Sequence, residues 1–492
     1  MTETAKKKRG MPSSFTILLA LLAIVAVITV IVSGTSGGEV TAARLSDFCT
    51  APVKGFADAL PVCLFVMILG GFLGMMTETG ALDNGIAVLV QKLKGNEIML
   101  IPVLMLIFSL GGTTYGMCEE TVPFYALLAA TMMAAGFDPM VGAATVLLGA
   151  GCGCLGSTVN PFAVGAAVDA LTGVDIAVNQ SIIIGLGAVL WIVTTAMSIV
   201  FVMNYAKKVK ADKGSTILSM QELKDAEEAH GKAASEVHKE VKLTGRQKGV
   251  LIAFAFTFVV MIVGFIPLAD LNEGVANFFD AGAVYDADGN AVVQGWSALI
   301  TGLPIGQWYF DEASTWFFLM AILIGIIGGL SEKQIVNTFI TGAADMMSVV
   351  LVIALARGIS VLMASTGLDV YVLDAAANAL AGLSGVIFAP MSFLVYFGLS
   401  FLIPSTSGMA TVSMPIMGPL AVKLGFSPEV MVMIFSAAIG VVNLFTPTSG
   451  AIMGGLALAK IEWTTWLKFA LKLIVALSVV CAVILTIACV ML

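Results

Sequence analysis

Long apolar runs separated by short polar segments set the pattern of this chain of 492 residues. A helix needs about 20 largely apolar residues to cross the hydrocarbon core of a bilayer. Seven runs approach or exceed that length without interruption: residues 15–32, 60–77, 181–205, 250–266, 313–330, 346–363 and 467–489. The pattern therefore predicts seven continuous transmembrane helices.

Other apolar stretches come as pairs of shorter pieces. Residues 98–110 and 121–135 are joined by a Gly- and Thr-rich tip, and residues 386–403 and 411–424 by a Ser- and Thr-rich tip. We expect each of these pairs to form a re-entrant hairpin. Residues 140–155 with 162–171, and 430–444 with 451–461, predict two spanning helices that break midway. The expected fold class is an all-α polytopic membrane protein with nine spans and two hairpins.

The interrupted segments occur twice with matching residues. Thr113-Thr114-Tyr115-Gly116-Met117 corresponds to Ser405-Thr406-Ser407-Gly408-Met409, and Gly136-Phe137-Asp138-Pro139 corresponds to Gly425-Phe426-Ser427-Pro428. In this register Ser157, Val159 and Asn160 fall on Thr446, Thr448 and Ser449. Repeated Gly- or Pro-interrupted apolar segments in the two halves of a chain point to a transporter's binding site near the bilayer midplane. We therefore expect an inverted repeat.

The distribution of charge predicts the orientation. Residues 206–248 contain ten Lys and Arg, whereas residues 249–332 contain none. The positive-inside rule places the first segment in the cytoplasm and the following polar segment outside. The expected organisation is a cytoplasmic N-terminal tail (1–13), a first repeat (14–205), a cytoplasmic charged loop (206–248), a connecting transmembrane helix (249–268), an extracytoplasmic loop (269–312) and a second repeat (313–492) that ends outside.

Composition agrees with a membrane protein, since 59% of the residues are hydrophobic and only 11% are charged, against about 25% charged in soluble domains. The seven cysteines lie in or beside apolar stretches, and Cys152 and Cys154 form C-x-C without a nearby His. We therefore expect free thiols rather than disulfides or a metal site. The two histidines, His230 and His238, are expected to be solvated. No catalytic or nucleic-acid-binding signature is present, so neither an enzyme nor a resident cofactor is expected.

Polar groups at the tips and breaks form the candidate site, because the free ends of half-helices hold ions and charged groups. The possible Na⁺ ligands are Thr113, Ser157 and Asn160 in the first half, and Thr446 and Thr448 in the second. The candidate substrate-binding residues are Thr114, Tyr115, Glu119, Glu120, Asn160, Ser405, Thr406, Ser407, Thr448, Ser449 and Arg357. The alternative is that the hydroxyls cap helix ends and the small residues permit close helix packing.

Glu119 and Glu120 break the symmetry, because their repeat partners are Thr411 and Val412. An ionisable residue within the membrane is by default a functional-site hypothesis. The pair is a candidate for binding substrate or a coupling proton, and the alternative is a structural ion pair with Arg357. Neither tip carries Lys or Arg, which a desolvated dianion would need. This favours a cationic or zwitterionic solute.

The motifs Gly-Gly-Thr-Thr-Tyr-Gly-Met-Cys-Glu-Glu-Thr, Gly-Ser-Thr-Val-Asn-Pro and Phe-Thr-Pro-Thr-Ser-Gly resemble those of bacterial YfcC-type carriers. These carriers group with the C4-dicarboxylate anaerobic carriers and the arginine/ornithine antiporters of the ion-transporter superfamily. The resemblance implies a scaffold that dimerises and a transport unit of hairpins and broken helices that moves as an elevator. It also implies Ser-Asn-Thr triplets at the sites, for which the nearest matches are Ser157-Thr158-Val159-Asn160 and Thr448-Ser449.

We therefore expect a secondary active transporter of a small charged or zwitterionic metabolite, coupled to Na⁺ or H⁺ or exchanging. A basic amino acid such as arginine or ornithine is the favoured substrate, and a C4-dicarboxylate is the alternative. A channel would need a continuous polar pore, and a membrane enzyme would need a His, Cys or metal constellation. The expected location is a bacterial inner membrane, with the N-terminus cytoplasmic, the C-terminus extracytoplasmic, and a homodimer in the lipid bilayer.

Overall fold

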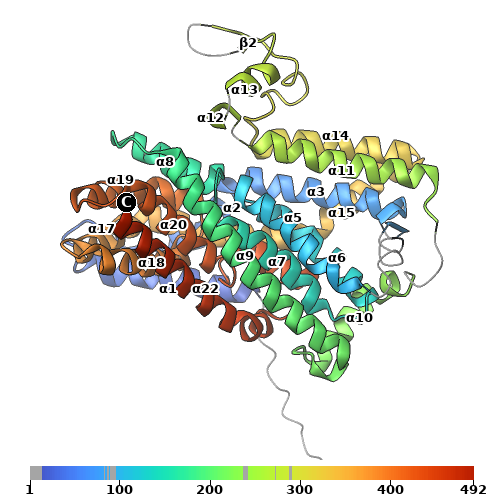
Figure 1. The fold of residues 1–492 in the computed structure, drawn as a ribbon, viewed down its shortest axis with the longest axis horizontal. Helices are drawn as coiled ribbons and strands as arrows, with labels where there is room; N and C mark the ends of the chain where they lie inside the picture. Colours follow the sequence, from blue (N-terminus) through green and yellow to red (C-terminus); the bar gives the residue numbers. More distant parts are fainter. Residues whose placement is uncertain are drawn as a thin grey trace, which may run out of the picture.

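The computed structural model describes residues 14–82, 84–85, 88, 96–236, 242–266, 268–271, 273–286 and 291–492, most of them helical (Figure 1). The predicted tail 1–13 and His238 lie outside these residues. Within the described ranges, eight helices are long and apolar enough to cross a membrane. Seven of them confirm the predicted continuous spans: α1 (Ser14–Ser33), α3 (Leu60–Glu78), α9 (Gln180–Ala211), α11 (Gly245–Phe265), α14 (Phe310–Gly328), α16 (Met347–Thr366) and α22 (Trp463–Met491).

The eighth long helix is the first arm of the first predicted hairpin. The short helix η1 (Glu97–Met99) continues into α5 (Leu100–Tyr115), so the helix passes the predicted end at residue 110. The glycines there do not break the helix, because they serve packing against the next helix, α7 (Pro139–Leu155). A Cβ on Gly112 would lie 2.2 Å from the carbonyl oxygen of Ala150.

The other interrupted segments fall close to their predicted positions. The first hairpin returns through η2 (Glu119–Thr121) and α6 (Val122–Ala134), and α7 is followed after a break by η3 (Pro161–Gly165) and α8 (Ala166–Thr172). The second hairpin consists of α18 (Gly385–Leu402) and α19 (Thr406–Lys423), and the second broken helix of α20 (Pro428–Val442) and α21 (Gly450–Leu458). The helix α17 (Leu368–Leu380) precedes α18 and was not predicted.

The helices α7 and α20 form the centre of the molecule. Nearly all of their residues are buried, and the two helices pack against each other as well as against α9, α18 and α22. A helix that is apolar on every side is expected in such a position. By contrast, α22 leaves a four-residue-spaced apolar strip exposed, consisting of Leu471, Val475, Val479, Val483 and Ile487. This strip fits contact with lipid.

A second group of helices surrounds two close helix crossings. The helix α2 (Leu45–Asp58) packs on α16, and α15 (Glu332–Asp345) packs on α3. A Cβ on Gly55 would lie 2.3 Å from the carbonyl oxygen of Ala354, and one on Gly342 would lie 2.4 Å from that of Gly70. Only glycine permits these approaches, as at other close helix interfaces in membranes.

The secondary structure differs from the prediction in two regions, the lobe after α11 and the segment 206–248. Residues beyond α11 form a lobe that projects from the helical body in Figure 1 and contains α12 (Leu268–Leu271), α13 (Glu273–Phe279) and a two-stranded antiparallel sheet of β1 (Val284–Tyr285) and β2 (Ala291–Val293). The all-α prediction is therefore wrong for this lobe. The strand β1 consists of Val284 and Tyr285, and β2 contains Val292 and Val293; both residue types favour extended backbone.

The segment 206–248, treated as a loop, is largely helical. It contains the end of α9, η4 (Lys213–Ser215), α10 (Met220–Glu236) and the start of α11. The expectation of a solvated His230 is wrong, because this side chain is buried and its Nε2 atom bonds the carbonyl oxygen of Leu458 at 3.1 Å. Packing of α10 against α6 brings it there.

Candidate functional site

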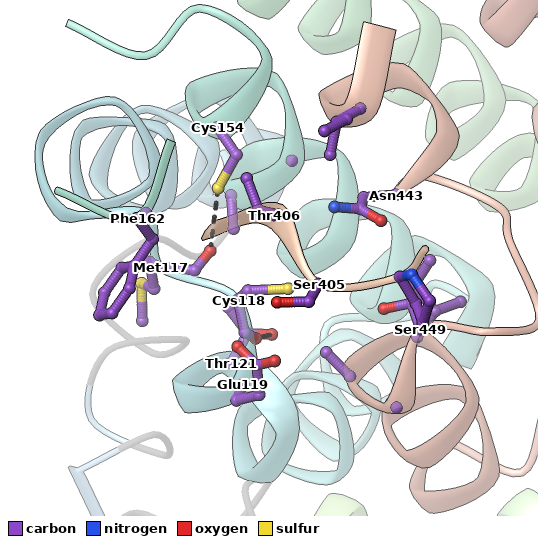
Figure 2. A pocket seen from close by; sticks show the side chains of 18 of the residues that line it. Met117, Cys118, Glu119, Thr121, Cys154, Phe162, Ser405, Thr406, Asn443 and Ser449 are labelled. Atoms are coloured by element: carbon purple, nitrogen blue, oxygen red, sulfur yellow. Dashed lines mark hydrogen bonds between the residues drawn. The ribbon is translucent and has the colours of Figure 1, made fainter. Parts of the chain in front are cut away.

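The four interruptions of the helical pattern meet around one cavity of about 190 Å³. The first tip contributes residues 116–121 and the second tip residues 404–407, while the two breaks contribute residues 160, 162 and 163 and residues 448–452. Figure 2 shows Met117, Cys118 and Glu119 of the first half on the opposite side of this space from Asn443 and Ser449 of the second half. The helix α16 closes another side with Ile353, Ala356 and Arg357.

The first tip turns at Gly116, which ends α5 in the left-handed conformation with φ of 79°. A Cβ on Gly116 would lie 2.5 Å from Oδ1 of Asn160, so the tip touches the first helix break directly. Because the helix continues to Tyr115, Thr113, Thr114 and Tyr115 lie in its last turn and not in the tip. None of these three residues lines the cavity.

The hydroxyl groups of the first half bond within the protein. Thr113 Oγ1 donates to the carbonyl oxygen of Gly156 at 2.7 Å, and Thr114 Oγ1 donates to that of Leu110 at 2.7 Å. The hydroxyl of Ser157 donates to the carbonyl oxygen of Cys154 at 2.6 Å. The bonds to Gly156 and Cys154 satisfy carbonyl groups that the end of α7 leaves open, whereas the bond of Thr114 lies within its own helix.

Asn160 holds the first break in place and also lines the cavity. Its Nδ2 donates to Ser157 Oγ at 2.9 Å, and its Oδ1 accepts from the backbone N–H groups of Phe162 at 2.9 Å and Ala163 at 3.3 Å. Tyr115 is buried and stacks on Phe265. Its hydroxyl has no hydrogen-bond partner among the described residues.

Glu119 and Glu120 both line the cavity but differ in their surroundings. Glu120 is buried, and its Oε2 accepts a hydrogen bond of 2.9 Å from the backbone N–H of Cys118, which fixes the tip. Glu119 is only half-buried. Among the described lining residues these are the two carboxylates, and Arg357 is the one cationic side chain.

Arg357 has a different partner from the one considered from the sequence. Its Nε forms an ion pair with Oδ2 of Asp58 at the end of α2, although the contact lacks the alignment of a hydrogen bond. The close crossing of α2 and α16 brings these two residues together. Arg357 lies near enough to Glu119 to act on it electrostatically, but it forms no ion pair with Glu119 or Glu120 in the described structure.

The second tip and second break present two helix N-termini to the cavity. Ser405 Oγ accepts from the N–H of Gly408 at 3.1 Å and so caps α19, which begins with Thr406 and Ser407. Ser449 stands before the first residue of α21 and makes no side-chain cap. Unpaired N–H groups and the helix dipole make such N-termini favourable for negative charge.

Thr446 and Thr448 form the second hydroxyl cluster. Their Oγ1 atoms lie 2.7 Å apart, and Thr446 Oγ1 also accepts from the N–H of Thr448 at 3.3 Å. Thr448 lines the cavity and Thr446 does not. The carbonyl groups before this break are bonded by two indole N–H groups, from Trp463 to Phe445 at 2.7 Å and from Trp466 to Leu444 at 2.9 Å.

The sequence analysis missed other residues that line the cavity, among them Cys118, Phe162, Ser436 and Asn443. Ser436 is buried in the middle of α20, and its hydroxyl has no hydrogen-bond partner in the described part of the chain. Because Ser436 interrupts an apolar stretch of α20, the sequence could have marked it as a candidate site residue. Asn443 closes α20 and begins the repeated motif, so its position also marked it.

The site combines charged and polar groups of both signs. Carboxylates lie at the first tip, while a guanidinium and two helix N-termini lie elsewhere around the same space. Among the described residues, no group of three or more His, Cys, Asp or Glu could hold a metal ion. The seven cysteines form no disulfide bond with one another in this structure.

Comparison with known proteins gives a match to the model of the C4-dicarboxylate anaerobic carrier family over residues 38–490. A Haemophilus influenzae protein is 28% identical over 445 residues, which cover 90% of this chain and 78% of the relative. "Putative basic amino acid antiporter YfcC" of Escherichia coli (strain K12) is 27% identical over 440 residues, which cover 87% of this chain and 77% of that protein.

Solved structures of two transport proteins resemble the chain at low sequence identity. MtrF of Neisseria gonorrhoeae, described as illuminating a class of antimetabolite efflux pumps, is 17% identical with a TM-score of 0.44, and the match covers 98% of this chain and 96% of MtrF. The YdaH transporter of Alcanivorax borkumensis is 16% identical with a TM-score of 0.46, and the match covers 97% and 98%.

Proposed function

Because the chain belongs to the C4-dicarboxylate anaerobic carrier family, we propose that it is a secondary active transporter whose substrate is a basic amino acid, of the arginine and ornithine type. The observation that carries this proposal is the excess of carboxylate over cationic groups in the cavity shared by both halves. Arg357 is already paired with Asp58, whereas Glu119 and Glu120 have no cationic partner in ion-pair contact among the described residues.

Burial makes this excess of carboxylate groups energetically important. A desolvated charge costs several kcal/mol unless it is paired or hydrogen-bonded. A substrate ammonium or guanidinium would supply the missing partner at the first tip. The name of the Escherichia coli relative supports the same substrate class.

A C4-dicarboxylate is the second candidate. The family name supports it, and so do the N-termini of α19 and α21, which face the cavity and favour anions. Against it stand the two carboxylates at the first tip, which would repel a dianion. Arg357 alone, already paired, does not outweigh them.

The proposed mechanism is an elevator. We infer that residues 14–205 and 313–492 are inverted repeats, that the hairpins α5–α6 and α18–α19 with the broken helices form the moving unit, and that α2, α3, α15 and α16 belong to a scaffold that dimerises. The matching order of hairpin and broken helix in both halves supports this. The charge pattern supports residues 206–248 in the cytoplasm and residues 269–312 outside an inner membrane, with the N-terminus inside and the C-terminus outside.

Coupling to Na⁺ or H⁺, or exchange of one solute for another, completes the proposal. For Na⁺, Thr448 and Asn160 are the candidate ligands that border the cavity, while Thr113, Ser157 and Thr446 lie behind them. Binding Na⁺ there would require their present hydrogen bonds to rearrange. For H⁺, Glu119 and Glu120 are the candidate carriers.

Transport by the purified protein in liposomes tests the function. Labelled arginine, ornithine, lysine, fumarate and succinate are offered with and without gradients of Na⁺, H⁺ or internal unlabelled solute. We expect uptake of the basic amino acids and negligible uptake of the dicarboxylates. Uptake of dicarboxylates alone would contradict the proposal and support the second candidate. The control is Glu119→Gln combined with Glu120→Gln, which should take up the basic amino acids with much lower affinity.

A further inference from the structure

Asp58 and Arg357 pair beside the close crossing of α2 and α16. A Cβ on Gly358, the residue after Arg357, would lie 2.8 Å from the carbonyl oxygen of Ala51 on α2. With the backbones this close, the side chain of Asp58 reaches Nε of Arg357. The packing of α2 on α16 therefore holds this ion pair in place, and neither tip contributes to it.

The ion pair uses only part of the guanidinium. Arginine has five N–H donors, and the contact with Asp58 is through Nε. No hydrogen bond or other ion pair of Arg357 is formed within the described residues, and its side chain borders the cavity. The terminal amino groups of the guanidinium are thus available to a bound molecule, in the planar geometry that suits a carboxylate.

A second feature of the structure brings the N-terminus of α21 to the same side. A Cβ on Gly450 would lie 2.3 Å from Cγ1 of Ile353 and 3.1 Å from its Cα, so this helix end rests on α16. Ile353 and Arg357 are four residues apart and therefore lie on one helix face. The N–H groups of the first turn of α21 and the guanidinium border the cavity together.

A buried polar group without a partner also borders the cavity. The hydroxyl of Ser436, a residue only 2% exposed, has no hydrogen-bond partner among the described residues and lines the same space. A buried polar group without a partner is costly. A bound solute with donors or acceptors would satisfy it.

We propose that Asp58 and Arg357 form the carboxylate-selecting pair of this site. Asp58 is a positioning residue that holds Arg357 through Nε, and the terminal amino groups of Arg357, with the first turn of α21, bind the substrate's α-carboxylate. The cationic end of the same molecule binds at Glu119 and Glu120. The inference rests on the proposed function and makes it more specific: the substrate is a basic amino acid with its carboxylate intact, and the corresponding decarboxylated amine is rejected.

The test compares lysine with its decarboxylated analogue, cadaverine, and arginine with agmatine, as competitors of labelled lysine uptake into liposomes. For the wild-type protein we expect each amino acid to compete at least about 10-fold better than its amine, because the amine lacks the charge-assisted hydrogen bonds to Arg357. Arg357→Gln is expected to raise the KM for lysine about 10-fold or more and to leave inhibition by cadaverine unchanged or stronger.

Asp58→Asn separates positioning from binding. It keeps Arg357 but removes the charge that holds it, so we expect a smaller rise in the KM for lysine with little change in kcat. Asp58→Glu should restore part of the discrimination. The matched control is Asp345→Asn, which removes an exposed carboxylate at the end of α15 that does not line the cavity. This control should retain wild-type discrimination.

The outcomes distinguish the inference from the function. Equal competition by lysine and cadaverine in the wild-type protein, or an equal loss of both in Arg357→Gln, would overturn the carboxylate-selecting pair while leaving a transporter of basic solutes. Absence of competition by any basic solute would overturn the proposed function itself. If Arg357→Gln does not insert as a stable protein, judged by size-exclusion chromatography, the Asp58→Asn and Asp58→Glu pair gives the deciding measurement.

Discussion

The two hairpin tips occupy equivalent places around one cavity but differ in charge. The first tip, residues 116–121, carries Glu119 and Glu120, whereas the second, residues 404–407, carries three hydroxyls and no charge. The tips also turn differently. The first tip bends at Gly116 in the left-handed conformation, and the second passes through an extended Ser405 directly into a helix.

This difference distinguishes the polar groups that cap the backbone at each tip from those that are available to a ligand. Both tips need their open backbone groups satisfied, and both do so locally, through Glu120 on Cys118 in the first and Ser405 on Gly408 in the second. Only the first tip adds a carboxylate, Glu119, that no cap uses. We infer that the second tip supplies the N-terminus of α19 and the first tip supplies the charge that selects a cation.

The largest expected effect comes from removing the charge of the first tip. Glu119→Gln combined with Glu120→Gln should lower the affinity for a basic amino acid about 30-fold or more, because truncating one partner of a buried charge pair costs about 2–5 kcal/mol. Competition of labelled lysine uptake measures it. The control is Thr411→Val, at the repeat position of Glu119. The hydroxyl of Thr411 donates to the carbonyl oxygen of Ser407 within the same helix, so we expect the affinity to change less than threefold. Unchanged affinity in the double variant would make the tips equivalent.

An intermediate effect is expected from the turn itself. Gly116→Ala places a Cβ in the left-handed region and against the side chain of Asn160. The conformation alone costs about 1–2 kcal/mol, and displacing Asn160 removes the cap of the first break. The repeat position, Gly408→Ala, lies in a right-handed helix where its Cβ would meet Ser405 Oγ at 3.0 Å. Thermal unfolding in detergent should show a clearly lower Tm for Gly116→Ala only. A similar fall in both would show that the tips are equally constrained.

The smallest expected effect lies at the other end of the first hairpin, where α6 packs against the charged helix α10, whereas the second hairpin packs against α8 and α17. Burial lowers the pKa of His230 below its ordinary value of 6.5. An undocked His230 therefore binds a proton more readily as the pH falls below about 6.5, so docking of α10 is complete above that value and weakens below it.

Hydrogen exchange measures this effect. Lowering the pH from about 7.5 to about 5.5, with rates corrected for intrinsic exchange, should increase exchange in α10 severalfold and leave α18 and α19 unchanged. His230→Gln retains an N–H donor for the carbonyl oxygen of Leu458 and should remove the pH dependence. If hydrogen exchange in α10 still depends on pH in His230→Gln, a titratable group other than His230 causes the effect.

The sequence predicted the elements of this fold well because hydrophobic length is a local property. Seven continuous spans, both hairpins and both broken helices follow from run length and from Gly, Pro, Ser and Thr interruptions. The prediction of helix ends was less accurate at glycines, which can either end a helix or allow close helix packing. Gly111 and Gly112 were expected to end a helix, yet they remain helical because close packing on α7 requires a residue without a side chain.

The chain alone thus predicted where polar groups interrupt the apolar segments, in two sets with matching residues. Only the tertiary structure decided which of them share a cavity: Glu119, Asn160 and Ser405 line it, whereas Thr113, Ser157 and Thr446 lie behind it in hydrogen bonds. It also gave Arg357 its partner. Asp58 lies far from Arg357 in the sequence, and the two meet because α2 and α16 cross on glycines. Run length is encoded locally, but pairing depends on helix crossings between residues far apart in the chain.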